Sequence, residues 1–270
     1  MSQTAAPDQE FFLRQYLNER AQRYEQESFI AADPISVAYR FTDRADIEIA
    51  AFIAASFAWG QRTTIINKAN ELLALMDNAP AEFIRQHTAR DRKRFEHFVH
   101  RTFQPTDAKY FVRRLQAHYR EHDSLESLFT AGMQPDDDDV SGALIHFHEQ
   151  FFNLADAPQR TRKHVATPAR KSSCKRLNMF LRWMVRPATA GVDFGLWQTI
   201  QPRQLLIPLD VHVQRVARRL GLLDRKQSDW QAVLELTERL RAFDADDPVK
   251  YDFALFGEGV LEKKDDPVEM

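Results

Sequence analysis

The sequence predicts an all-α protein of about ten or more helices. Glycine is scarce, with 8 in 270 residues, and leucine, alanine, arginine, glutamate and glutamine are common, which favours helix over sheet. No alternating run rich in valine, isoleucine and threonine is long enough for a strand. A hydrophobic content of 44% lets the chain bury a sizeable core, in one large or two small domains.

Apolar residues recur at helical spacing through the first part of the chain. The run from Ile47 to Trp59 is apolar on nearly every side, so we expect it to be the buried central helix of a domain, ended by Gly60. Thr106 is expected to cap the helix that follows it. The helices predicted here span 8–30, from Asp43 or Asp46 to 59, 63–76, 80–87, 91–100, 107–122 and 140–153.

Breaks in this pattern divide the chain into four segments. Residues 1–42 form an N-terminal helical segment that we expect to pack on the C-terminal lobe, and residues 43–155 form a helical lobe. Residues 156–260 hold a basic segment and the last helices, and residues 261–270 are expected to be a polar tail.

Several classes of protein are excluded by composition. The single cysteine, Cys174, rules out a disulfide framework and a four-cysteine metal cluster, so we predict no metal, no cofactor and no iron–sulfur cluster. No run approaches about 18 apolar residues and the N-terminus has no apolar signal core, so we expect a cytoplasmic protein without a membrane partner.

Residues 157–192 contain no aspartate or glutamate but nine lysines and arginines. Such a stretch predicts a surface for a polyanion, although a solvated loop is the alternative. Ser172 or Ser173 is expected to cap the helix that begins here, leaving its first N–H groups for a phosphate. The expected nucleic-acid contacts in this segment are Arg170, Lys171, Ser172, Ser173 and Arg176.

A second basic helix follows Pro208. Asp210 stands at its N-cap position, and Val213, Val216, Ala217 and Leu220 make one apolar face before Gly221 ends the helix. From this pattern alone, Asp210 is a helix cap. After it, Ser228 or Asp229 is expected to cap a further helix, and Asp247-Pro248 to open the last one.

The stretch from Leu209 to Leu222 reads Leu-Asp-Val-His-Val-Gln-Arg-Val-Ala-Arg-Arg-Leu-Gly-Leu and resembles the signature of the helix-hairpin-helix DNA glycosylases, the superfamily of endonuclease III. This resemblance implies an all-α fold in two lobes similar to that of the glycosylases. It also implies that Asp210 is the catalytic carboxylate and that His212 and Arg215 contact nucleic acid. The stretch from Ala55 to Ala69 is similar to a second motif of the superfamily. It implies that Gln61 reaches into the DNA stack, with Arg62 beside it, whereas a solvated turn is the alternative for Gln61.

In the glycosylases a glycine-rich hairpin precedes the signature and carries the lysine that forms a Schiff base in bifunctional members. The corresponding stretch here is Thr167-Pro-Ala-Arg-Lys-Ser-Ser-Cys-Lys-Arg, which lacks the glycines and places Lys175 35 residues before Asp210. The resemblance implies a nucleophilic Lys175; a phosphate contact or a plain surface lysine is the alternative. Cys174 has no partner base and is expected to be a buried thiol.

The runs Cys174-Lys-Arg-Leu-Asn-Met-Phe-Leu-Arg-Trp-Met-Val-Arg and Pro208-Leu-Asp-Val-His-Val are similar to those of an uncharacterised bacterial family. We therefore expect a DNA-binding, base-excision-type protein, an N-glycosylase with or without lyase activity, whose Lys175 and Asp210 face a cleft between lobes. Trp183 and Trp197 would stack a flipped base there or pack in the core. The alternatives are a non-catalytic DNA- or RNA-binding protein and a helical adaptor for an acidic protein.

Overall fold

The structure, a computed structural model, describes residues 7–134 and 136–261, so nearly all of the predicted tail at 261–270 lies outside the described residues. Within them the elements are α-helices and short 3-10 helices, and the only β pairing consists of two isolated bridges, which confirms the all-α prediction. The α-helices are α1 (Pro7–Tyr24), α2 (Glu27–Ile30), α3 (Arg44–Phe57), α4 (Arg62–Ala74), α5 (Pro80–Gln86), α6 (Pro105–Tyr119), α7 (Glu126–Thr130), α8 (Ser141–Phe151), α9 (Lys175–Val185), α10 (Val211–Arg219), α11 (Trp230–Arg241) and α12 (Tyr251–Leu261).

Most of the apolar run forms α3, and nearly all residues of this helix are buried. The helix ends at Phe57, with Ala58 as its C-cap, and so stops before the predicted end at Trp59 and Gly60. It packs against α4, α5, α9 and the 3-10 helix Pro34–Arg40. Its one fully buried acid, Glu48, accepts hydrogen bonds from Tyr119 Oη, Trp197 Nε1 and Leu125 N, each at 2.8 Å. A buried carboxylate needs such donors because it has lost its water. Glu48 therefore ties three distant segments to the central helix.

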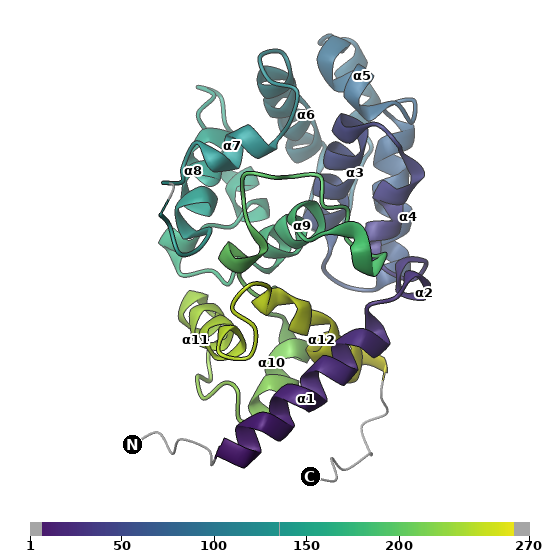
Figure 1. Cartoon of the computed structure of the whole chain (residues 1–270). Helices are drawn as coiled ribbons and strands as arrows, with labels where there is room; N and C mark the ends of the chain where they lie inside the picture. Colours follow the sequence, from purple (N-terminus) through teal and green to yellow (C-terminus); the bar gives the residue numbers. More distant parts are fainter. Residues whose placement is uncertain (1–6, 135, 262–270) are drawn as a thin grey trace.

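Figure 1 shows α1, α10, α11 and α12 gathered at one end of the molecule and α3 to α9 at the other. Helix α1 lies along α12, and α12 also packs against α10. Gly257 allows the first contact, since a Cβ at this position would lie 2.4 Å from the Tyr24 ring. Tyr16 Oη donates to Glu258 Oε2 at 2.7 Å across the same interface. The beginning and the end of the described chain thus form one packed unit.

Local details differ from the sequence predictions. The helix predicted at 8–30 is broken between α1 and α2, the one at 91–100 is only a 3-10 turn over Asp91–Phe95, and α7 was not predicted. The cap of α6 is Gln104 and not Thr106, because Pro105 takes the first helical position and Gln104 forms a reciprocal capping box with Asp107. Among the described helices, none is both long and apolar enough to cross a membrane.

Candidate functional site

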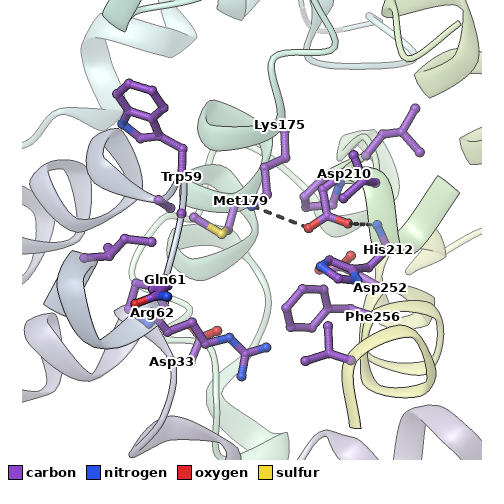
Figure 2. A pocket seen from close by; sticks show the side chains of 18 of the residues that line it. Asp33, Trp59, Gln61, Arg62, Lys175, Met179, Asp210, His212, Asp252 and Phe256 are labelled. Atoms are coloured by element: carbon purple, nitrogen blue, oxygen red, sulfur yellow. Dashed lines mark hydrogen bonds and ion pairs between the residues drawn. The ribbon is translucent and has the colours of Figure 1, made fainter. Parts of the chain in front are cut away.

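A cavity of about 790 Å³ lies where the two groups of helices meet (Figure 2). The start of α4, one face of α9, the start of α10 and one face of α12 line it, together with the turn around Asp33. Gly60 shapes the α4 side, because its φ of +112° turns the chain sharply between Trp59 and Gln61. The cavity therefore collects side chains that are far apart in the sequence.

Lys175 and Asp210 meet at this cavity. The Nζ atom of Lys175 lies 3.6 Å from Asp210 Oδ2, and the two side chains are 27% and 15% exposed, so a ligand in the cavity can reach both. The other oxygen, Asp210 Oδ1, accepts from His212 N at 2.8 Å and from Val213 N at 2.9 Å, which is the predicted N-cap of α10. Asp210 thus caps its helix with one oxygen and presents the other to Lys175, as the dashed lines in Figure 2 show.

Helix α9 begins at Lys175 for a reason other than the predicted serine cap. Its N-cap is Cys174, in the left-handed region with φ +50°, and no side chain caps the helix. Ser172 Oγ instead accepts from Cys174 N at 3.3 Å, within the turn that precedes the helix. Cys174 is buried, and burial raises the pKa of its thiol to about 12, so the thiol is neutral at pH 7. This confirms the prediction of a buried thiol.

From Lys175 onward, α9 turns Lys175, Met179 and Arg182 toward the cavity, because residues spaced by four and three share one helix face. Arg182 is buried and donates to Asp193 Oδ1 at 3.3 Å and to Asp252 of α12. Burial raises the pKa of Asp252 to about 6, against the opposing effect of Arg182. Burial likewise raises the pKa of Asp33. The cavity wall therefore holds both cations and carboxylates at close range.

The structure brings together only some of the predicted site residues. Gln61, Arg62 and His212 line the cavity with Lys175 and Asp210. The others lie outside its lining: Arg170, Lys171, Ser172, Ser173, Arg176 and Arg215.

Two of those outlying arginines are held by the protein itself. The Arg176 guanidinium donates to the carbonyl oxygens of Ser56 and Lys163, and burial lowers its pKa to about 10. Arg215 donates to the carbonyl oxygen of Gly259 near the end of α12. Arg170 and Lys171 are exposed to solvent.

Residues 157–192 contain no acids, but carboxylates from other parts of the chain lie beside them in the folded protein. Arg160 pairs with Asp107, and Arg182 pairs with Asp252, so carboxylates from distant helices neutralise them. Arg186 pairs with Glu25, Asp193 and Asp247 in the same way. Part of this basic stretch is therefore internal, and the exposed cations that remain include Lys163, Arg170 and Lys171.

A model of the family described as "Protein of unknown function (DUF2400)" matches residues 33–261. The chain belongs to this family. The matched range contains every residue that lines the cavity except Phe29. No curated protein and no solved structure matches the chain.

Some cavity residues were missed by sequence reasoning. Trp183 and Trp197, predicted to stack a base or to pack in the core, are 0% and 1% exposed and lie outside the cavity lining, so they are core residues. Trp59 lines the cavity instead, with the Arg101 guanidinium 4.6 Å from its ring centre. The sequence feature that could have identified Trp59 was its position directly before the Gly60 turn, just after a buried helix. No local sequence pattern indicated that Phe256 and Asp252 of α12 would line a cavity.

The arrangement supports acid–base and nucleophilic chemistry. An amine and a carboxylate oxygen 3.6 Å apart can contact the same substrate atom, and a shortening of a few tenths of an ångström would bring them within reach of proton transfer. Among the described residues, no group of three or more histidine, cysteine, aspartate and glutamate side chains is placed to hold a metal ion.

Proposed function

We propose that this protein is a DNA-binding, base-excision-type enzyme: an N-glycosylase with lyase activity that uses Lys175 and Asp210. The observation that carries the proposal is the 3.6 Å approach of Lys175 Nζ to Asp210 Oδ2 at a cavity of about 790 Å³. A cavity of this size accommodates a nucleoside. An enzyme that acts on the glycosidic bond of DNA must take the nucleotide out of the stack into such a pocket.

The resemblance of residues 209–222 to the helix-hairpin-helix glycosylases supports the same assignment. That resemblance implies a catalytic carboxylate at Asp210 and a cleft between two lobes. A carboxylate that caps its helix with one oxygen and meets Lys175 with the other, at a cavity between two groups of helices, is compatible with both implications.

The chemistry follows from the two groups. Asp210 accepts a proton from Lys175, and the neutral amine attacks C1′ of the deoxyribose while the C1′–N bond to the base breaks. The bonding electrons leave with the base, which takes up the proton that Asp210 accepted, and the regenerated Asp210 carboxylate stabilises the positive charge that develops on the sugar. Opening of the sugar ring moves a proton to O4′ and gives a C1′=Nζ imine. Loss of a C2′ proton then eliminates the 3′ phosphate, and hydrolysis of the imine frees Lys175.

DNA binding would rest on the cations that the protein leaves in solvent. Lys163, Arg170 and Lys171 are exposed. Other basic side chains of this stretch, such as Arg160 and Arg176, contact carboxylate or carbonyl oxygens of the protein itself. Gln61 is exposed at the start of α4 and lines the cavity, so it is placed to touch a strand that enters it.

The test is incision of duplex oligonucleotides that each carry one damaged base or one abasic site. We expect the wild-type protein to release a base and cut the strand. Lys175→Ala should lower the rate of strand cleavage by about 100-fold or more, and Asp210→Asn should lower the rate of base release by about the same factor. Lys93→Ala, which removes an exposed lysine outside both the cavity and the basic stretch, serves as the matched control and should retain activity in full.

Two results of the incision assay would contradict the proposal. If the protein binds these duplexes but neither releases a base nor cuts an abasic strand, it is a non-catalytic nucleic-acid-binding protein. If incision occurs but is the same in Lys175→Ala and in the control, the lysine mechanism is wrong.

A further inference from the structure

Three nitrogen atoms in the cavity wall are buried without a hydrogen-bond partner among the described residues: Trp59 Nε1, Arg62 Nη2 and His212 Nδ1. Buried polar groups in folded proteins are almost always paired, because an unpaired donor loses its hydration and gains nothing in return. All three residues line the cavity, so a rotation of each side chain toward the open space would offer these atoms to a polar ligand.

Two of these residues face the same aromatic ring. The Arg62 guanidinium lies over Phe256, 4.8 Å from the ring centre, and the His212 ring meets Phe256 edge to face at 6.3 Å. Figure 2 shows Arg62 reaching from the α4 side and His212 from the α10 side, with Phe256 between them. The Phe256 ring therefore holds the Arg62 guanidinium at the cavity by a cation–π contact.

The chemistry of these atoms determines which ligand edge fits. Arginine Nη and tryptophan Nε1 can only donate, and histidine Nδ1 donates or accepts according to its tautomer. A ligand edge with carbonyl oxygens accepts from these groups. An edge with an exocyclic amino group would place donor against donor, and both would remain unpaired. Met179, Phe29 and Phe256 supply apolar surface for the faces of a flat ring.

We propose that the cavity selects a nucleobase whose recognised edge carries carbonyl oxygens in place of amino groups, and that Arg62 is the residue that determines this specificity. The inference rests on the proposed function, since it names the substrate class of the same site. Uracil against cytosine, and hypoxanthine against adenine, are the matched pairs, because in each pair a carbonyl oxygen replaces an amino group.

The experiment is a binding measurement that needs no catalysis. Each of the four bases is placed in a duplex as a 2′-fluoro nucleotide, which resists cleavage, opposite a tetrahydrofuran abasic spacer, so that no base pair has to be broken. A fifth duplex carries the spacer on both strands. Fluorescence anisotropy gives the Kd of each. We expect the carbonyl member of each pair to bind about tenfold or more tightly than its amino partner.

Arg62→Gln should bring the two members of each pair within about twofold, because the glutamine amide can donate or accept. Arg90→Gln, an exposed arginine outside the cavity lining, is the control and should keep the full preference. The wild-type comparison alone already decides the inference, whatever the variant does to folding.

Equal affinity within each pair, or a preference for the amino member, would overturn the inference. If that occurs while the fifth duplex is bound and abasic strands are cut through Lys175, the proposed function stands and only the base preference is wrong. If none of the duplexes binds, both are wrong.

Discussion

Lys175 Nζ lies 3.6 Å from Asp210 Oδ2, while Oδ1 of the same carboxylate accepts from the backbone N–H groups of His212 and Val213. One side chain therefore carries a structural role on one oxygen and a potential chemical role on the other. A helix cap fixes the position of the carboxylate, and the lysine reaches it from a different helix. The two roles can be separated by substitution.

Asp210→Asn should keep the cap and lose the chemistry. Asparagine is as good an N-cap as aspartate, so the free energy of unfolding should change by less than about 0.5 kcal/mol, whereas Asp210→Ala should cost about 1 kcal/mol. Both variants should lose base release. Urea unfolding and the incision assay measure the two properties. Equal destabilisation by asparagine and alanine would show that the side-chain oxygen contributes nothing as a cap.

The exposed cations before α9 should control the salt dependence of DNA binding. Replacing Arg170 and Lys171 together by alanine should reduce the slope of log K against log salt by about 1 to 2, because each lost phosphate contact removes about 0.9. The free energy of unfolding should not change. Anisotropy titrations between about 50 and 200 mM salt give the slope. An unchanged slope would place the DNA on another face.

Arg176→Ala provides the contrast, since its guanidinium joins the carbonyl oxygens of Ser56 and Lys163. Loss of these bonds leaves two carbonyl groups without their charged donor, so we expect the free energy of unfolding to fall by about 2 kcal/mol. Thermal and urea unfolding measure this loss. A variant as stable as the wild-type protein would mean that the arginine is free to bind a phosphate after all.

Asp107 should make stability depend on pH. Burial alone would raise the pKa of its carboxyl, but hydrogen bonds from His164, Thr161 and the Gln104 N–H lower it to about 2. Its contribution is therefore complete well above the unfolded pKa of about 3.9 and is lost as the pH falls toward 2. The gap in unfolding free energy between wild type and Asp107→Asn should shrink by about 1 kcal/mol from pH 6 to pH 3. A gap that stays constant or widens would contradict this.

Glu48 should be among the most sensitive positions in the core. Glu48→Ala leaves Trp197 Nε1 and the Tyr119 hydroxyl buried without an acceptor, so the free energy of unfolding should fall by about 3–5 kcal/mol. Glu71→Ala, which removes an exposed partner of Lys68, is the matched control and should cost less than about 1 kcal/mol. Similar losses in the two variants would show that the buried network is not needed.

Local sequence patterns predicted the elements that carry the site. The apolar run of α3, the amphipathic faces of α9 and α10, and the caps Asp210 and Asp229 depend on residues within a turn or two of each other, and the structure confirms them. The Lys175–Asp210 distance could not be derived in this way, because it depends on how two helices pack.

The sequence predictions that were wrong also concern features that depend on how distant parts of the chain pack. Whether an arginine is exposed depends on its spatial neighbours, and Arg182 finds its partner Asp252 70 residues later in the chain. The serine caps of α9 were predicted from residue type, whereas a left-handed Cys174 begins that helix. Burial of Trp183 and Trp197 reflects packing against α3 and its neighbours, which no local pattern records.

A covalent adduct between the protein and an abasic strand would identify the nucleophile. The protein is incubated with an abasic duplex, reduced with borohydride and digested with trypsin, and the DNA-linked peptide is sequenced by mass spectrometry. We expect a single adduct on Lys175, found in the peptide from Ser172 to Arg176 because trypsin no longer cuts after the modified lysine. Lys175→Ala should lose the adduct, and Lys93→Ala, which removes an exposed lysine outside the basic stretch, should retain it. Adducts spread over surface lysines, or one that survives Lys175→Ala, would show that Lys175 is not the nucleophile.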